Sequence, residues 1–267
     1  MRGMKMRFYD AEQGSLDDLA RTLDIPEWVL KRLLDHDPPR GAWEGVVRDL
    51  GRKLARRERV EEPIELEPEL LEGTEESGEA LCRIGNEWEF RTSVGGEEEE
   101  DYEEEEGFIE GYPGMTNIPD DICKPGRMVG SIHSHPDYPA RPSDPDVKWA
   151  VEHEETIMCI DSPASRICWF ADKPSDLGFI PNKGHDPIAP CSIGVRGTWF
   201  DEWGGAYSET WNINPPEFIE SYDEEEFEQS GDAVKEGDLR AVCRIDSRFA
   251  ECIYRSGDKV RGFSRKR

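Results

Sequence analysis

Residues 127–150 read RMVGSIHSHPDYPARPSDPDVKWA and hold the densest group of chemically informative side chains in this 267-residue chain. The apolar residues before the histidines predict a buried strand, and His133 and His135, two positions apart, then lie on one face of it. A loop rich in proline and arginine follows. Ser143 predicts a helix start, because serine is a preferred N-cap and a proline follows in the first turn. Asp146 is therefore expected on that turn, close to the strand end.

Two imidazoles and one carboxylate form a donor set of the kind found in catalytic zinc sites. Three protein ligands at about 2.0–2.2 Å leave a fourth position for water. Such a water has a pKa near ~7 and is a nucleophile at neutral pH, but it needs a base for its proton and a donor for the developing oxyanion. Ser143 is placed for the second task. The base must come from elsewhere in the chain.

The pattern His-Ser-His-Pro, six residues, then Ser-x-x-Asp resembles the signature of the JAMM/MPN-type zinc metalloproteases. The resemblance covers residues 127–170, which include the helix after the motif and a following strand hairpin. It implies an α/β fold, a deaminase-like mixed sheet with flanking helices. It also implies that His133, His135 and Asp146 bind Zn²⁺, and that Ser143 stabilises the tetrahedral intermediate.

Members of this family place a catalytic glutamate upstream, in a pattern like Glu-x-x-Gly followed by three apolar residues. Residues 76–82, ESGEALC, resemble this pattern with Glu76 as the general base. Glu79 then stands where glycine is usual. Aligning Gly78 with that glycine nominates Glu75 instead, but it places Glu79 inside the apolar strand. This cost favours Glu76 and leaves Glu75 as the alternative.

The resemblance implies an enzyme that hydrolyses peptide or isopeptide bonds. Family members typically act at the Gly-Gly tail of ubiquitin-like proteins, so the expected partner is a ubiquitin-like or sulfur-carrier protein. One alternative is a catalytically silent MPN-like scaffold that recruits protein partners. Another is a regulatory protease docked to DNA or to a partner through an N-terminal module. Silent relatives usually lack metal ligands, and the intact ligand set therefore favours the enzyme.

Charge is distributed unevenly and predicts a domain boundary near residue 60. Residues 1–60 hold 13 basic and 11 acidic residues, whereas the whole chain has a net charge of −27. Three apolar runs in this segment predict a small all-α module resembling a helix-turn-helix. A DNA-reading helix should be clearly basic, but Lys31 and Arg32 of the second run are balanced by acidic neighbours. This favours a packing or partner-binding bundle over DNA contact.

The metalloprotease core is expected over residues 61–175. It includes an acidic loop, residues 97–106, in which nine of ten side chains are Asp or Glu and which should be solvated. Residues 176–267 read as a β-rich C-terminal extension of unknown role. His36 and His185 stand alone in loop-like sequence and are expected to be solvated.

The cysteine pattern leaves the redox state open. Cys159 and Cys168, like Cys243 and Cys252, are nine residues apart across an expected hairpin, so each pair could form a cross-strand disulfide. Disulfides are unusual in the cytosol outside hyperthermophiles. The N-terminus has no secretory pattern, and no apolar run approaches the roughly 18 residues of a spanning helix. A cytoplasmic protein without membrane contact is therefore expected.

Overall fold

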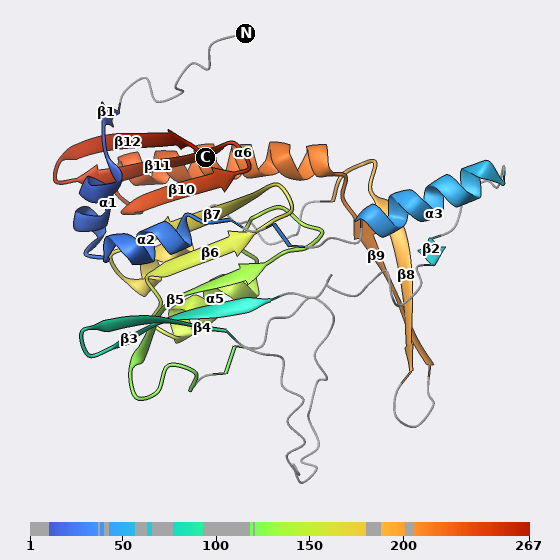
Figure 1. Cartoon of the computed structure of the whole chain (residues 1–267), viewed down its shortest axis with the longest axis horizontal. Helices are drawn as coiled ribbons and strands as arrows, with labels where there is room; N and C mark the ends of the chain where they lie inside the picture. The colour runs from blue at the N-terminus through green and yellow to red at the C-terminus, as the bar shows by residue number, and fades with distance from the viewer. Residues whose placement is uncertain are drawn as a thin grey trace.

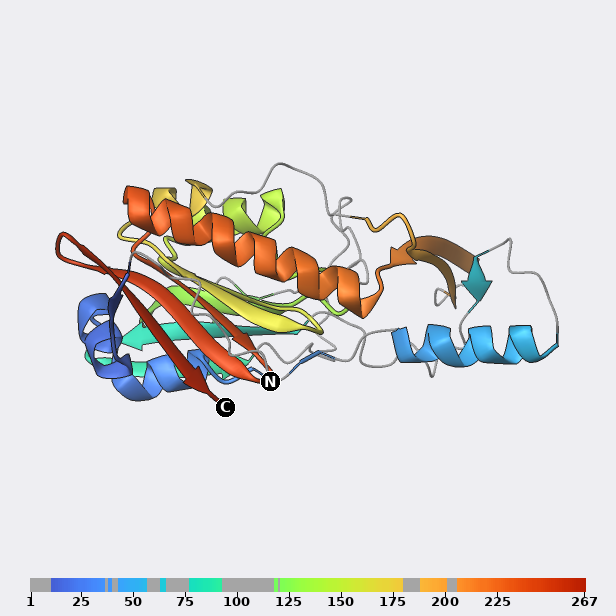
Figure 2. The same cartoon turned by 90° about the horizontal axis from the view of Figure 1, so that it is seen from above.

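The computed structural model of this chain has a mixed α/β fold, with helices on both faces of one large sheet (Figure 1, Figure 2). This confirms the predicted fold class at that level. No helix in the described part of the chain is both long and apolar enough to cross a membrane. The structure describes residues 11–36, 38–39, 43–56, 63–65, 77–92, 118–119, 121–179, 188–200 and 206–267.

The large sheet contains nine described strands. They are β1 (Glu12–Gln13), β3 (Gly78–Ile84), β4 (Glu87–Thr92), β5 (Arg127–Ser134), β6 (Ile157–Asp161), β7 (Ser165–Phe170), β10 (Ala241–Asp246), β11 (Phe249–Ser256) and β12 (Lys259–Lys266). Their order is β1-β12-β11-β10-β7-β6-β5-β3-β4. The pairs β5–β6 and β1–β12 are parallel. The crossover from β5 to β6 contains α5 (Asp144–Glu152), the helix that the serine cap predicted.

Helices cover the two faces of the sheet because strand side chains alternate between them. On one face, α1 (Leu16–Leu23) and α2 (Glu27–Leu33) pack their leucines against residues such as Ile132 and Cys159. On the other face, Ile160 and Trp169 lie in one cluster with Phe227 of α6 (Pro216–Glu236). The helix α5 and the short 3-10 helix η1 (Pro174–Phe179) lie on this second face (Figure 2).

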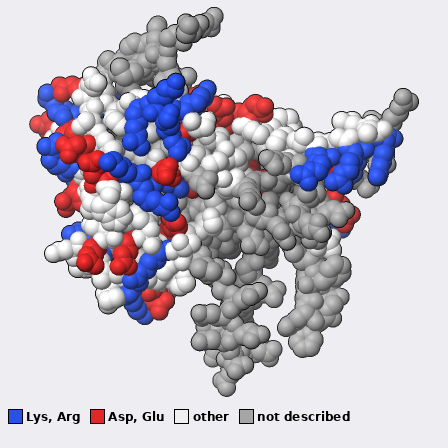
Figure 3. Space-filling model, in the orientation of Figure 1, with Lys and Arg blue, Asp and Glu red and all other residues white. Residues whose placement is uncertain are grey.

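A smaller lobe projects from this body (Figure 1). It consists of α3 (Trp43–Ala55) and a sheet in the order β2-β8-β9. These strands are β2 (Ile64–Glu65), β8 (Ile193–Phe200) and β9 (Ala206–Ile213). Val46 of α3 is buried against Val195 and Ile213 of this sheet. Figure 3 shows basic side chains gathered along α3, whereas α2, the expected recognition helix, carries both signs of charge.

The large sheet and its core cross both predicted domain boundaries. Leu19, Leu30 and Leu33 from the first 60 residues are completely buried in the cluster that contains residues of β5, β6 and β7. Strand β10, from the expected C-terminal extension, pairs directly with β7. Residues 176–267 were expected to be β-rich, and this expectation is wrong for residues 216–236, which form the 21-residue helix α6. The acidic loop, residues 97–106, lies outside the described residues.

Three disulfides link strands of the large sheet to one another or to a neighbouring turn. Two are the pairs left open by the sequence, Cys159–Cys168 and Cys243–Cys252, and the third joins Cys82 to Cys123. In the sheet register Cys168 also lies opposite Cys243. The first two disulfides therefore form one row across β6, β7, β10 and β11, on the face covered by α1 and α2.

Candidate metal centre

The structure brings together the three residues predicted as metal ligands. His133 and His135 lie at the end of β5, and Asp146 lies in the first turn of α5. One ligand atom from each residue lies within 4.8 Å of the other two. The Nε2 atoms of His133 and His135 are 3.5 and 3.7 Å from Oδ2 of Asp146. Such a group could hold a metal ion.

His135 is oriented through both its ring and its main chain. Its Nδ1 lies 3.1 Å from the carbonyl oxygen of Pro139. A carbonyl oxygen can only accept, so this hydrogen bond places the proton on Nδ1 and a lone pair on Nε2, which faces Asp146. The main-chain N–H of His135 donates to the carbonyl oxygen of Asp161 at 2.6 Å. The tautomer and position of His135 therefore both suit a ligand.

Asp146 is held by the cap of its own helix. The Ser143 Oγ accepts a hydrogen bond from the Asp146 main-chain N–H at 3.3 Å, and Asp146 Oδ2 accepts one from the Ser143 N–H at 2.7 Å. Burial opposes ionisation, but the adjacent imidazoles of His133 and His135 and the hydrogen bond from the Ser143 N–H hold the pKa of Asp146 below its usual range. Its carboxylate is consequently ionised at neutral pH. The structure gives Ser143 a capping role, and its contact with an oxyanion stays a prediction.

Ser134, the middle residue of the His-Ser-His motif, binds Ser77, which directly follows the expected base Glu76 in the chain. Ser134 Oγ accepts a hydrogen bond from the Ser77 main-chain N–H at 2.7 Å, and the Ser134 N–H donates to the Ser77 carbonyl at 3.0 Å. Gly78 pairs with His133 in the β3–β5 register. Glu76 and Glu75 lie outside the described residues. The neighbour of Glu76 in the chain is thus fixed beside the metal ligands.

The loop between the histidines and Ser143 is supported by residues that sequence reasoning missed. Asp223 of α6 is completely buried, and its Oδ1 accepts the Ala140 main-chain N–H at 2.7 Å. Its Oδ2 accepts the hydroxyls of Ser162 and Ser165 at 2.6 and 2.7 Å. Burial raises the pKa of Asp223 to about 6, despite these donors. A residue of α6 therefore supports the loop between the histidines and Ser143.

Two further contacts connect this loop to the C-terminal part of the chain. Glu226, one turn beyond Asp223, lies 3.6 Å from Nε of Arg141, and burial raises the pKa of Glu226 to about 7. The side-chain amide of Asn214 donates to the carbonyl oxygen of Asp137 at 3.4 Å. No local sequence pattern signalled these contacts, because the partners are more than 70 residues apart.

Glu155 is another buried carboxylate that the sequence did not single out. Its Oε2 accepts the hydroxyl of Ser131 at 2.7 Å, and within the described residues its Oε1 has no hydrogen-bond partner. Burial raises the pKa of Glu155 to about 7. The side chain is shielded from solvent, as is Ser131. This position suits support of β5 better than proton transfer to a solvent-facing substrate.

Comparisons of the chain with protein-family models, with curated proteins and with solved structures gave no match.

Proposed function

We propose that this protein is a zinc-dependent hydrolase of peptide or isopeptide bonds with a JAMM/MPN-type fold and site. The observation that carries the proposal is the convergence of His133, His135 and Asp146 at a strand end and a helix start. Two imidazole nitrogens and one ionised carboxylate match a catalytic zinc site with an open fourth position. The orienting hydrogen bond on His135 is of the kind that such ligands usually have.

The chain supplies a residue for each remaining task. His133, His135 and Asp146 would hold a zinc ion, which would supply a water of lowered pKa. Glu76 would accept the proton of the attacking water and deliver it to the departing amine. The hydroxyl of Ser143 donates to the oxygen on which negative charge develops. The anchoring of Ser77 by Ser134 supports Glu76 as the base, because it fixes the adjacent residue beside His133.

The proposed substrate is the C-terminal tail of a ubiquitin-like or sulfur-carrier protein, and this part rests on the motif resemblance alone. The silent scaffold is the competing proposal. The completeness of the ligand set and of its supporting hydrogen bonds argues against it. The burial of α1 and α2 in the main core argues against a separable DNA-docking module.

Zinc content and turnover of four proteins test the proposal. Wild type, Glu76→Gln, Glu75→Gln and His135→Ala are purified, and zinc per chain is measured by elemental analysis. Hydrolysis is measured on a fusion cleaved after a Gly-Gly tail. We expect about one zinc in every protein except His135→Ala. Glu76→Gln should lose about 10²–10⁴-fold in turnover, because only the proton acceptor is removed.

Glu75→Gln is the matched control, since it removes the neighbouring carboxylate and should retain turnover. The reverse result would transfer the role of base to Glu75. Folded wild-type protein that refuses added zinc would overturn the proposal and favour the scaffold.

A further inference from the structure

Asp161, the last residue of β6, contacts both the metal site and the N-terminal helices. Its carbonyl oxygen accepts the His135 main-chain N–H at 2.6 Å. In the β5–β6 register it lies beside Ser134, so its side chain lies on the face opposite the metal ligands. That is the face covered by α1 and α2 (Figure 2). Asp161 therefore connects the position of a metal ligand to the packing of the far face.

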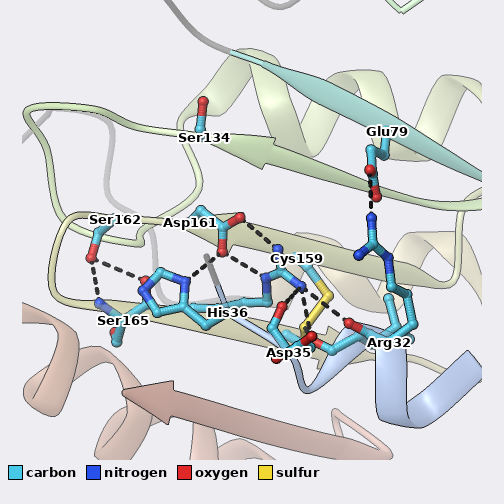
Figure 4. Close-up of polar contacts among 12 residues, drawn as sticks. Arg32, Asp35, His36, Glu79, Ser134, Cys159, Asp161, Ser162 and Ser165 are labelled. Carbon is cyan, nitrogen blue, oxygen red and sulfur yellow. Dashed lines mark hydrogen bonds and ion pairs between the residues drawn. A yellow bond between two sulfur atoms is a disulfide. The ribbon is translucent and has the colours of Figure 1, made fainter. Parts of the chain in front are cut away.

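The buried carboxylate of Asp161 is fully engaged there. Arg166 donates from Nε to Oδ1 and from Nη2 to Oδ2, both at 2.6 Å. Nδ1 of His36 lies 3.1 Å from Oδ1 (Figure 4). Burial opposes ionisation, but the hydrogen bonds from Arg166 and His36 hold the pKa of Asp161 below its usual range. A two-pronged contact of this kind fixes orientation as well as distance. The expectation that His36 is solvated is wrong, because it is buried in this contact.

The same guanidinium binds the end of α2. Arg166 Nη1 donates to the carbonyl oxygens of Leu33 at 3.1 Å and Asp35 at 2.9 Å. Carbonyl groups at a helix C-terminus have no partner within the helix, so a buried cation satisfies them well. A single side chain thus joins α2 to the carboxylate of Asp161. His36, just after α2, adds the second connection.

A separate contact joins α2 to the other strand that flanks β5. Arg32 Nη2 donates to Oε1 of Glu79 at 2.9 Å (Figure 4). Glu79 belongs to β3, the strand that follows the expected base. This ion pair gives a structural reason for a glutamate where the resembled family usually has glycine. We call these five residues the α2 clamp: Arg32, His36, Glu79, Asp161 and Arg166.

We propose that Arg166 and Asp161, assisted by His36, are positioning residues that set the main chain of His135 by tying the end of β6 to α2. The inference rests on the proposed metal site. Removing the two-pronged contact leaves Asp161 free to shift, and its carbonyl oxygen carries His135 with it. Loss of partners that orient a ligand typically costs about 10–100-fold in metal affinity or activity.

The test compares Arg166→Lys with Arg244→Lys in the full-length protein. Lysine keeps the charge but cannot form the two-pronged contact. Arg244 is the matched control, because it is similarly buried and forms its ion pairs with Glu224 and Asp246, outside the α2 clamp. Zinc affinity is measured by competition with a chelator, and ligand geometry by the visible absorption of bound Co²⁺. Folding of each variant is checked by thermal melting.

We expect Arg166→Lys to weaken zinc binding about 10–100-fold and to change the Co²⁺ spectrum, with kcat falling more than KM rises. Arg244→Lys should change zinc affinity less than about 2-fold, even where its melting temperature falls equally. Equal affinities and spectra for the two variants would overturn the inference. If Arg166→Lys does not fold, His36→Asn provides the same comparison. A wild type that binds neither metal would instead defeat the proposed function.

Discussion

The carboxylate of Asp223 makes the stability of this protein depend on pH in a direction that the structure specifies. Its pKa is raised from 3.8 to about 6 because burial disfavours the ionised form. A group with a raised folded-state pKa binds its proton more tightly in the native state. Its contribution to stability is complete below pH 3.8 and is lost as the pH rises through about 6.

The size of the effect follows from the shift. One pKa unit corresponds to about 1.36 kcal/mol, so Asp223 should lower the unfolding free energy by about 3 kcal/mol across this window. In Asp223→Asn the side chain is neutral at every pH. The difference in stability between wild type and this variant should therefore decline by about 3 kcal/mol between pH 3.5 and pH 7.

Urea unfolding followed by tryptophan fluorescence measures this difference at half-unit pH steps. A chelator is present throughout, so that metal binding contributes nothing to the measured pH dependence. Glu226, whose pKa is also raised, titrates in both proteins, so most of its contribution cancels. Asp232→Asn, an exposed position on the same helix, is the control and should show no such trend. A pH-independent difference would refute the reasoning, because the three donors to Asp223 would then fully compensate its burial.

Three other perturbations test the packing around the site. Leu33→Ala in α2 should cost about 2–5 kcal/mol of unfolding free energy in urea, because its side chain is completely buried, whereas the half-exposed Val47→Ala should cost less than about 0.5. Gly130→Ala would place a methyl group 2.5 Å from the carbonyl oxygen of Ile157 in β6. We therefore expect a lower melting temperature and weaker zinc binding. Unchanged values would contradict the close spacing of β5 and β6. Replacing both Cys82 and Cys123 by alanine should lower the unfolding free energy by about 4 kcal/mol. Removing the Cys159–Cys168 disulfide should lower it by only about 2.6 kcal/mol, because that disulfide closes a shorter loop. Equal losses in urea unfolding would contradict this ranking.

The elements that the sequence predicted are those with strong local patterns. The helices α1, α2 and α3 have apolar residues at helical spacing, and α5 has a serine cap followed by proline. The convergence of His133 and His135 with Asp146 followed from a strand, a short loop and a helix start, all within fourteen residues.

The helix α6 was missed because its buried face is only partly apolar. Positions buried at helical spacing include Asp223, Glu226 and Ser230, which bind loop groups and other polar side chains instead of packing as apolar groups. Hydrophobic periodicity cannot detect such a helix. Partners distant in sequence were equally invisible: His36 and Asp161 are 125 residues apart, and nothing near either residue indicates the other.

The packing of α1 and α2 against the end of the chain has a consequence for biosynthesis. The hydroxyl of Tyr254 donates to the carboxylate of Asp18, a partner 236 residues earlier, and β1 pairs with β12. A ribosome therefore releases these leucine-rich helices long before the strands that bury them. Contacts of such sequence separation form slowly, and apolar segments that wait for them are prone to aggregate. The apolar residues of α1 and α2 must therefore stay shielded until β10 and β11, whose residues share their core cluster, have been synthesised.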